Sequence, residues 1–595
     1  GENAFFVRAP SAQPRARMYT KRAPPERPQP RAMSGGRGAA RAAVLLLCWL
    51  PPALRAAPAG RQPHIVYMLA DNLGWGGVGF LRREAPGGET PEVRTPHLDR
   101  LADGGVRLLR FYAYKMCSPS RSSLLSGRLP VHVNFHNSPQ TQPRAGIPVN
   151  MTTLPRKLRE AGYRTHQVGK WHVGFASPDH IPRGRGFDTS FGYFHAYNGY
   201  LGQWGSGETA CPGFPGMVEY GDGSLFKGWC TESSVRARHM SYTTDLWDTD
   251  GPAYGQNGTG YEEAMFASRA VGIIEGHDMN GPPLFLYYAM HTLHSPLCAP
   301  PAYLEKFAFI PNEERRFVAA MTAVMDDAVA SVVAALQRTG LWKDTVFIWT
   351  SDNGAAIELI TGAKSAYPLR GGYYTNWEGG IRTPALVSGG FLPDAARGRA
   401  VDGYVHIADW YATLCGLAGA SADDPLAAAS GLPPPDSLDV WPLIVGLNSS
   451  SPRHSWLQTP LQGDSDKHGG DACYIHGPYK LLVGNVTQAS WCGREYPNES
   501  VLWDTWATVE RCTSPAKRGC LFHIFDDPEE RSDLALELPE VVDEILALME
   551  REQAAVYDPD RGAAEPDRAC AAMASNGGFW GPWRAAEGGD QPGVR

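Results

Sequence analysis

Residues Ile65–Ala70 read IVYMLA, an unbroken apolar run that begins the globular part of the chain. An apolar run of this length without alternation is typical of a strand buried on both faces of a parallel sheet. The runs Leu284–Met290 (LFLYYAM) and Val346–Thr350 (VFIWT) have the same character. We therefore expect these three segments to be neighbouring core strands of one large sheet.

Segments with helical periodicity lie among these strands. We expect helices at Pro96–Ala102, Leu154–Ala161, Glu262–Glu275 and Glu314–Arg338, the last followed closely by Gly340. Alternating strands and helices predict a three-layer α/β sandwich with a mostly parallel central sheet. Active sites of such sheets gather at the carboxyl ends of the strands, so the residues that follow each strand are the first candidates for a functional site.

The character of the sequence changes after about residue 445. Short strand-like pieces such as Tyr479–Val483 and a helical segment, Pro539–Gln553, replace the long alternation. We expect a main domain at 61–445, a smaller C-terminal α+β subdomain at 446–558 and a flexible tail at 559–595, which is rich in Gly, Ala and charge.

The first 60 residues have the composition of a leader. Arg37 and Arg41 precede the apolar run Ala42–Leu50, and prolines and small residues follow it. This order is typical of a secretory signal peptide, with Met33 as the expected start. The apolar run is shorter than the about 20 residues of a spanning helix, so we expect no stable membrane span.

Other features agree with export to the secretory pathway, with a lysosomal or extracellular destination. Several of the 11 cysteines should form disulfides there, and the best local candidates are Cys211–Cys230 and Cys512–Cys520. A net charge of −7 on 595 residues gives no basic footprint, so we expect no nucleic-acid partner. The expected glycosylation sites are the Asn-x-Ser/Thr sequons at Asn150, Asn257, Asn448, Asn485 and Asn498.

Two strands end in polar pairs that suit a metal ion. Asp71-Asn72 follows the first strand, and Asp352-Asn353 follows the strand near residue 350. An Asp-Asn pair after a strand is commonly a turn or a helix cap. If the two strand ends converge, however, their oxygens can bind one hard cation, Ca²⁺ or Mg²⁺.

The segment 117–128, between these strands, reads CSPSRSSLLSGR. By itself it fits a helix start, with Ser118 as the cap and Pro119 at the first position, and Cys117 as a buried thiol or half of a disulfide. The pattern Cys-x-Pro-Ser-Arg followed by Leu-x-Gly-Arg, however, resembles the signature of the sulfatase family. In that family the cysteine is oxidised to formylglycine by a formylglycine-generating enzyme, which reads the Pro and the Arg.

The resemblance extends from about His64 to about Leu536 and is closest to the arylsulfatase B-like branch of this family, which belongs to the alkaline phosphatase superfamily. Four further stretches carry it, namely GKWHVG at 169–174, HSP at 294–296, NWEGGIR at 376–382 and FDDPEE at 525–530. Lys170 and His172 lie two apart in the first of these, and on an extended segment they would face the same side.

The resemblance implies a sulfatase mechanism for an aryl sulfate or a sulfated carbohydrate. Formylglycine from Cys117, hydrated to a gem-diol, would be the nucleophile, and a divalent metal, Ca²⁺ or Mg²⁺, would bind Asp71, Asn72, Asp352, Asn353 and residue 117 itself. Further roles are implied for four side chains. Arg121 and Lys170 would hold the diol, His294 would protonate the leaving alcohol, and His172 would remove the proton whose loss expels sulfate.

Two positions depart from the family pattern. Asn72 stands where a second aspartate is usual, which predicts weaker metal binding. Tyr373 stands where a lysine usually contacts the sulfate, and a tyrosine carries no positive charge near neutral pH. Arg370 and Lys364 are the alternative cations, and without one of them we expect weakened turnover.

Two other hypotheses remain open on the sequence alone. One is a degenerate, non-catalytic relative that binds sulfated glycans, which the presence of Cys117, Arg121 and Lys170 disfavours. The other is a phosphate ester hydrolase of the same superfamily, whose nucleophile would be Thr, Ser or an unmodified Cys. Whether residue 117 becomes formylglycine separates these hypotheses most directly.

Overall fold

The computed structural model describes residues 62–137, 141–206, 211, 228–232, 234, 240–357, 363–461, 470–495 and 507–586. The leader expected at 1–60 and the sequon at Asn498 lie outside the described residues. Three of the other sequon asparagines are exposed, and Asn257 is half-buried.

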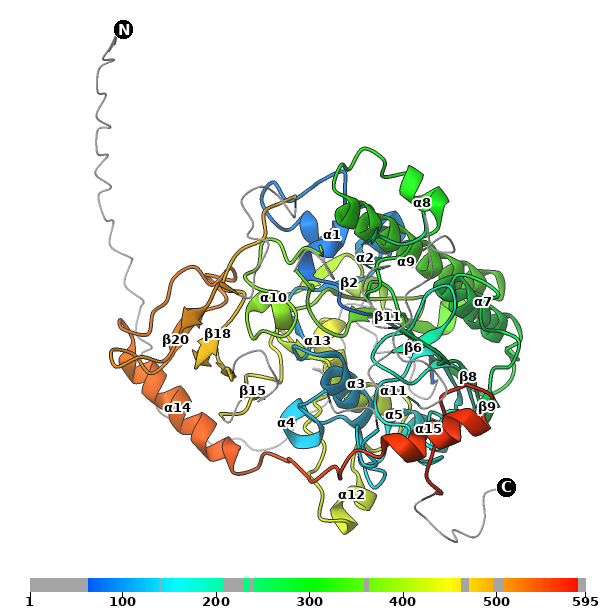
Figure 1. The fold of residues 1–595 in the computed structure, drawn as a ribbon. Helices are drawn as coiled ribbons and strands as arrows, with labels where there is room; N and C mark the ends of the chain where they lie inside the picture. The colour runs from blue at the N-terminus through cyan, green and yellow to red at the C-terminus, as the bar shows by residue number, and fades with distance from the viewer. Residues whose placement is uncertain are drawn as a thin grey trace, which may run out of the picture. The chain divides into compact units, whose positions relative to one another are not determined.

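A ten-stranded mixed sheet forms the centre of the described chain (Figure 1). Its strands are, in spatial order, β13 (Arg399–Val401), β2 (Val106–Leu108), β12 (Ala385–Ser388), β11 (Thr345–Ser351), β1 (His64–Ala70), β10 (Leu284–Ala289), β4 (Arg164–Lys170), β5 (Thr189–Tyr193), β8 (Trp247–Asp248) and β9 (Gly251–Pro252). The three strands expected from sequence are therefore adjacent.

The middle of this sheet is parallel. Strand β1 pairs in parallel with β11 on one side and with β10 on the other, and β10 and β5 flank β4 in parallel. Ala70 is in register with Ser351, so β1 and β11 end side by side. Parallel strands bring their carboxyl ends to one edge, and this edge carries the candidate site.

Each face of the sheet is covered by helices, because alternate side chains of β1 point to opposite faces. Ile65, Tyr67 and Leu69 belong to one buried cluster, and Val66 and Met68 belong to another. The first cluster includes α3 (Cys117–Ser126), α5 (Leu154–Glu160) and α11 (Asp409–Leu417). The second includes α1 (Gly79–Arg82), α2 (Pro96–Asp103), α7 (Glu262–Glu275) and α9 (Glu313–Arg338). The three-layer α/β sandwich is confirmed.

Helix α9 is the longest of the described helices. The side chain of Asn312 caps it by accepting a hydrogen bond from the backbone N–H of Arg315, at 3.0 Å. Within the described part of the chain, α9 alone has the length and composition of a membrane-spanning helix. Its apolar side chains, Phe317 and Met321 among them, pack on the sheet as in a core helix.

A second, four-stranded antiparallel sheet follows the main sheet in sequence, as expected. Its order is β15 (Ser455–Thr459), β16 (Ala472–His476), β17 (Tyr479–Val483) and β20 (Cys520–His523), and α14 (Pro539–Gln553) packs on it through Val542, Ile545 and Met549. The same apolar cluster includes Trp377 and Ile381, so this sheet also supports the segment that leads into α10 (Glu378–Ile381).

The remaining described elements are short. They are η2 (Trp75–Gly77), β3 (Phe111–Tyr112), α4 (Pro130–Val133), β6 (Trp204–Ser206), β7 (Met240–Thr244), α8 (Pro301–Glu305), η3 (Leu341–Asp344), η4 (Asp394–Ala396), β14 (Val405–His406), α12 (Pro425–Ala429), α13 (Trp441–Ile444), β18 (Asn485–Val486), β19 (Glu510–Arg511) and α15 (Pro566–Ser575).

The segment after residue 558 is more ordered than its composition indicates. Helix α15 packs in the main core through Ala569 and Met573, and the indole of Trp580 is fully buried. The indole N–H of Trp580 donates to Thr243 Oγ1 at 2.9 Å. The expectation of a flexible tail therefore does not hold for residues 566–583. Although the segment is rich in Gly and Ala, its contacts with residues distant in sequence hold it against the main domain.

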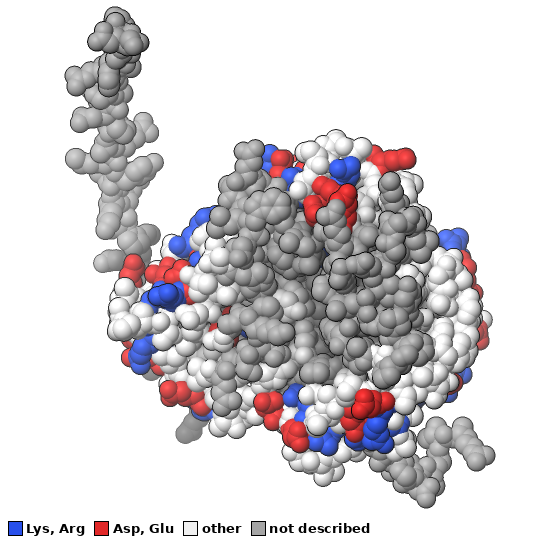
Figure 2. Space-filling model, viewed as in Figure 1, with Lys and Arg blue, Asp and Glu red and all other residues white. Residues whose placement is uncertain are grey.

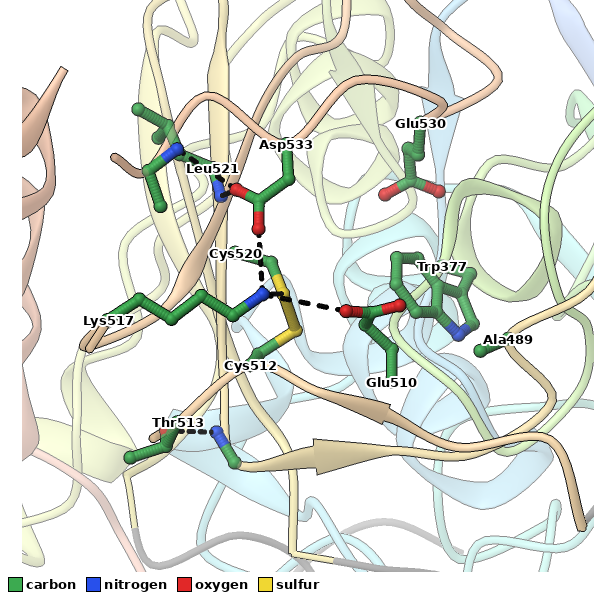
Figure 3. Close-up of a disulfide and its surroundings, with 12 residues drawn as sticks. Trp377, Ala489, Glu510, Cys512, Thr513, Lys517, Cys520, Leu521, Glu530 and Asp533 are labelled. Atoms are coloured by element: carbon green, nitrogen blue, oxygen red, sulfur yellow. Dashed lines mark hydrogen bonds and ion pairs between the residues drawn. A yellow bond between two sulfur atoms is a disulfide. The ribbon is translucent and has the colours of Figure 1, made fainter. Parts of the chain in front are cut away.

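The expected disulfide between Cys512 and Cys520 is present (Figure 3). It closes a short loop in which Lys517 lies between two carboxylates, 2.8 Å from Asp533 and 3.5 Å from Glu510. Figure 3 shows the ammonium group beside the sulfur atoms, so the disulfide and the ion pairs fix the same loop.

The expected pairing of Cys211 with Cys230 is wrong. Cys211 is bonded to Cys570 of α15, 359 positions away, and Cys230 is bonded to Cys298. Cys211 and Cys230 were expected to pair because they are close in sequence, but the fold brings α15 back to the main domain and places Cys570 beside Cys211. Among the described residues, Cys117, Cys415, Cys473 and Cys492 are buried free thiols.

On the face of the molecule shown in Figure 2, the described basic and acidic side chains lie interspersed. Elsewhere among the described residues, exposed groups form ion pairs, such as Arg83 with Asp103 and Arg338 with Glu275. Exposed pairs of this kind contribute little stability each.

Candidate active site

The polar pairs after β1 and β11 meet at the carboxyl edge of the sheet. The backbone N–H of Asn72 donates to Asp352 Oδ1 at 3.2 Å, and Asn353 Nδ2 donates to Asn72 Oδ1 at 2.6 Å. Asp71, Asp352 and Asn353 are fully buried. Two pairs separated by some 280 positions thus form one cluster of oxygen atoms.

Cys117 lies at the first position of α3 and points at this cluster. Its Sγ is 3.6 Å from Asp71 Oδ1 and 3.7 Å from Asn72 Oδ1. The helix begins two positions earlier than a cap at Ser118 would place it, with Met116 as the N-cap residue. Residue 117 therefore lies at a helix N-terminus, where free N–H groups and the helix dipole favour a bound anion.

Two buried cations balance the two carboxylates. Arg121, one turn after Cys117, donates to Asp352 Oδ2 at 2.9 and 2.7 Å and to Asp71 Oδ2 at 3.3 Å. Lys170 ends β4 and donates to Asp71 Oδ2 at 2.6 Å. All four side chains are fully buried, so none of the charges is relieved by water.

These charges perturb the acids in opposite directions. Burial raises the pKa of Asp71, but Lys170, His294 and Arg121 outweigh it and lower this pKa well below its usual value. Burial and the neighbouring Asp71 raise the pKa of Asp352 to about 6, against the opposing effect of Arg121. Burial also raises the pKa of the Cys117 thiol, so the unmodified cysteine stays protonated and is a poor nucleophile.

The cluster fits a hard divalent cation. Asp71, Asn72, Asp352 and Asn353 offer side-chain oxygens, the ligand type that Ca²⁺ and Mg²⁺ prefer. The Oδ1 atom of Asn353 is buried and accepts no hydrogen bond from the described residues. A buried carbonyl oxygen without a donor is costly, and a cation would satisfy it. Ligand atoms of Asp71, Cys117 and His294 also lie within 4.8 Å of one another.

His294 completes the wall beside Cys117. Its Nδ1 is 2.8 Å from the carbonyl oxygen of Ser295, which leaves Nε2 free of this contact. The ring of Tyr197 stacks on the imidazole with centroids 5.6 Å apart. Burial lowers the pKa of His294 to about 4, and Lys170 lowers it while Asp71 opposes the shift.

His172 lies in the same buried group, but not on an extended segment. Strand β4 ends at Lys170, and His172 has a φ of 56°, in the left-handed region. Lys170 and His172 therefore do not lie on one extended segment, contrary to the expectation from sequence. The His172 Nδ1 atom is buried and forms no hydrogen bond with the described residues. Burial, Lys170 and Arg121 lower the pKa of His172 well below its usual value.

Tyr373 lies directly over Cys117. Its hydroxyl is 3.3 Å from Cys117 Sγ, and its backbone N–H donates to the carbonyl of Ala355 at 2.7 Å. The ring packs against Tyr374 with centroids 4.0 Å apart. Burial raises the pKa of Tyr373 well above its usual value, so this hydroxyl stays neutral and acts only through hydrogen bonds.

Sequence reasoning missed a buried polar layer behind His294. The hydroxyl of Tyr200 donates to the carbonyls of His291 and His294 at 3.0 Å each, and His291 Nδ1 is 2.6 Å from Glu262 Oε2. Glu263 Oε2 accepts from the backbone N–H of His291 at 3.1 Å. The two glutamates begin α7, and acidic residues are common in the first turn of a helix, so the sequence does not distinguish them. The one signal for this layer was His291, which lies three positions before His294.

Two of the stretches that carried the resemblance lie away from Cys117. Glu378 and Glu530 bind the same lysine, Lys480, at 3.0 and 2.5 Å, and the backbone N–H of Glu378 donates to Glu530. All three side chains are fully buried. These residues join the C-terminal sheet to the loop that carries Tyr373, so they support the site without lining it.

The comparison with known families decides to which family the chain belongs. The sulfatase family model matches residues 63–420, more than half of the chain. The chain belongs to the sulfatase family. This places it among the sulfuric ester hydrolases, as expected from the motif at 117–128.

Curated relatives extend over most of the chain. Arylsulfatase J of Mus musculus is 33% identical over 551 residues, which cover 88% of this chain and 81% of that protein. N-acetylgalactosamine-6-sulfatase of Mus musculus is 29% identical over 84% of this chain and 87% of that protein. Among solved structures, Ps i-CgsB in complex with k-i-k-neocarrahexaose superposes with a TM-score of 0.64, at 23% identity, over 87% of this chain and 97% of that one. The last likeness concerns the fold alone.

Proposed function

We propose that this sulfatase hydrolyses the sulfate ester of a sulfated carbohydrate or an aryl sulfate, and that it does so after oxidation of Cys117 to formylglycine. The observation that carries the proposal is the position of Cys117. It lies at a helix N-terminus, with Asp71 and His294 within 4.8 Å and the oxygen cluster beneath it.

Two groups that the structure does not contain would supply chemistry here. A hydrated formylglycine offers two hydroxyls, one to attack the sulfur atom and one through which sulfate is later expelled. A divalent cation, of which Ca²⁺ is our first choice and Mg²⁺ the alternative, supplies a Lewis acid. Asp71, Asn72, Asp352 and Asn353 would hold the cation, with residue 117 facing it.

The residues of the chain provide charge and protons. Lys170 and Arg121 orient Asp71 and stabilise negative charge that gathers at residue 117. As the S–O bond to the alcohol breaks, His294 gives a proton to the departing oxygen. His172 then takes the proton of the second hydroxyl as sulfate leaves, and its buried Nδ1, without a partner among the described residues, suits a proton acceptor.

We also propose that the protein matures in the secretory pathway and acts in the lysosome or outside the cell. A formylglycine-generating enzyme would be its partner during maturation. The three disulfides among the described residues support an oxidising compartment. The exposed sequon asparagines, Asn150, Asn448 and Asn485, are accessible to glycosylation.

Hydrolysis by protein secreted from eukaryotic cells tests the proposal. Wild type and Cys117→Ala are compared on an aryl sulfate, a panel of sulfated monosaccharides and the matching phosphate esters, with added Ca²⁺. We expect release of sulfate by wild type alone. Faster release of phosphate than of sulfate would favour the phosphate ester hydrolase. Release of neither by protein that carries formylglycine would favour a non-catalytic, glycan-binding relative.

A further inference from the structure

Two aromatic rings lie against the imidazole of His294, and they differ in exposure. The ring of Tyr197 stacks on it with centroids 5.6 Å apart and an angle of 7° between the planes. The imidazole of His291 lies 6.0 Å away, centroid to centroid, at an angle of 29°. His291 is fully buried, whereas Tyr197 is half-buried. Of these two rings, only that of Tyr197 therefore reaches solvent.

The loop that follows β5 is anchored on both the core and His294. The side-chain amide of Asn198, which is fully buried, donates to Glu262 Oε1 at 2.8 Å. Two positions further on, the hydroxyl of Tyr200 donates to the carbonyl of His294 at 3.0 Å. The backbone is thus fixed one and three positions after Tyr197, so the ring of Tyr197 is held in place beside the imidazole.

The proposed reaction brings the alcohol part of the substrate to this place. A ring nitrogen of His294 lies within 4.8 Å of ligand atoms of Asp71 and Cys117, so the imidazole borders the point where the ester bond would break. In the proposed mechanism His294 protonates the departing oxygen, which requires this oxygen within hydrogen-bond reach of the imidazole. The carbon skeleton attached to that oxygen extends from His294 toward solvent, and Tyr197 is the half-buried ring that lies against His294.

A tyrosine ring in this position favours one kind of alcohol. A six-membered ring, either aromatic or a pyranose, can pack on the ring of Tyr197 and remove apolar surface of both from water. A short acyclic alcohol covers less of the tyrosine ring and gains less. The ring of Tyr197 should therefore distinguish substrates by the shape of the alcohol part, independently of the sulfate group.

We propose that Tyr197 is a specificity-determining residue of this active site, against which a ring in the alcohol part of the substrate packs. The inference rests on the proposed function and narrows it. The preferred esters are those whose sulfated oxygen is attached to a six-membered ring or lies one carbon from it, and acyclic alkyl sulfates are disfavoured. Tyr373, over Cys117, then borders the sulfate group, and Tyr197 borders the alcohol.

Calorimetric titration with three ligands that cannot be hydrolysed tests this without turnover. Phenylmethanesulfonate has a CH₂ group in place of the ester oxygen of phenyl sulfate, propane-1-sulfonate is an acyclic counterpart, and inorganic sulfate lacks the alcohol part. In excess Ca²⁺, we expect Tyr197→Ala to weaken binding of phenylmethanesulfonate about 10-fold, the effect of one lost ring contact. Affinities for propane-1-sulfonate and inorganic sulfate should change less than about 2-fold.

Two further variants separate the ring contact from other effects. Tyr197→Phe keeps the ring and should bind phenylmethanesulfonate within about 2-fold of wild type. Tyr254→Ala is the matched control and should bind all three ligands as wild type does. Tyr254 follows the edge strand β9, and its ring packs on Phe579 with centroids 5.1 Å apart.

Three results would overturn the assignment. One is equal affinity of wild type and Tyr197→Ala for phenylmethanesulfonate. Another is an equal loss for all three ligands, because this would show that Tyr197 only supports the fold or the imidazole of His294. The third is wild type that binds phenylmethanesulfonate no more tightly than propane-1-sulfonate, a result that does not depend on the folding of any variant.

The failure of the proposed function would look different. It would appear as absence of formylglycine and of ester hydrolysis in wild type, whatever the titrations show. Where wild type hydrolyses phenyl sulfate, Tyr197→Ala should raise KM about 10-fold and change kcat little, since the ring contact is present in both the bound substrate and the transition state. A lower kcat with unchanged KM would show instead that Tyr197 acts only through His294, and would overturn the assignment.

Discussion

Replacing Asn72 by aspartate tests the proposed metal site at a ligand position that carries no charge. Asn72 Oδ1 accepts a hydrogen bond from Asn353 Nδ2 at 2.6 Å and lies 3.7 Å from Cys117 Sγ. An aspartate oxygen can keep the same donor, so the substitution changes the charge of the oxygen cluster and little of its shape. We expect tighter binding of Ca²⁺ and of Mg²⁺.

The magnitude follows from exchanging a neutral contact for a charged one. That exchange adds about 1–1.5 kcal/mol, which corresponds to about a 10-fold lower Kd. Without a cation, the new carboxylate would repel Asp71 and Asp352, both fully buried, and would destabilise the folded protein. Cation binding relieves this repulsion, and this relief further increases the apparent affinity of Asn72→Asp for the cation.

Two assays detect the two expected effects, tighter cation binding and lower stability of the cation-free protein. Calorimetric titration should show the lower Kd, and thermal unfolding should show a lower Tm than wild type in chelator but a larger rise on adding Ca²⁺. Asn280→Asp is the control, since Asn280 is exposed in the turn before β10 and adds the same charge far from the site. Equal or weaker cation affinity in Asn72→Asp, with Asn280→Asp like wild type, would refute the assignment of residue 72 as a ligand.

Three further outcomes are expected. Burial lowers the pKa of His294 to about 4, so the fraction of protonated His294 grows as the pH falls. As the pH is lowered from 7 to 5, kcat/KM for substrates with poor leaving groups should therefore increase, and His294→Gln should lose this pH dependence. Burial raises the pKa of Asp326 to about 7, above its unfolded value. The stability that Asp326 contributes is therefore present near pH 4 and is lost as the pH rises through 7. Between pH 4 and pH 7, chemical denaturation should show wild type losing up to about 1.4 kcal/mol per pH unit relative to Asp326→Asn. Cys570→Ser should cost about 2–5 kcal/mol in the same assay by opening the link to Cys211, and non-reducing peptide maps that join Cys211 to Cys230 instead would contradict the structure.

The core strands could be predicted because burial on both faces requires apolar residues throughout. The main helices could be predicted because one buried face gives them a periodic apolar pattern. IVYMLA has no alternation, and the structure buries Ile65–Ala70 completely. The helices Glu262–Glu275 and Pro539–Gln553 have the predicted ends. The edges of the sheet could not be predicted, because β8 and β9 have two residues each and carry no periodic pattern.

The site was predictable where a residue follows a core strand or lies in a family motif, as for Asp71, Asp352 and Cys117. It was not predictable where tertiary structure decides. The left-handed backbone of His172 and the return of Cys570 to Cys211 depend on contacts distant in sequence. The position of the Arg370 guanidinium over the rings of Trp377 and Trp491 likewise depends on contacts distant in sequence.

The most direct test of the central claim is the chemical state of residue 117. Protein secreted by eukaryotic cells is digested, and the peptide that bears this residue is analysed by mass spectrometry with and without a carbonyl-reactive hydrazine. Our account predicts an aldehyde in place of the thiol, and sulfate release that Cys117→Ala abolishes. A peptide that carries only the free thiol or a disulfide at residue 117 would contradict it.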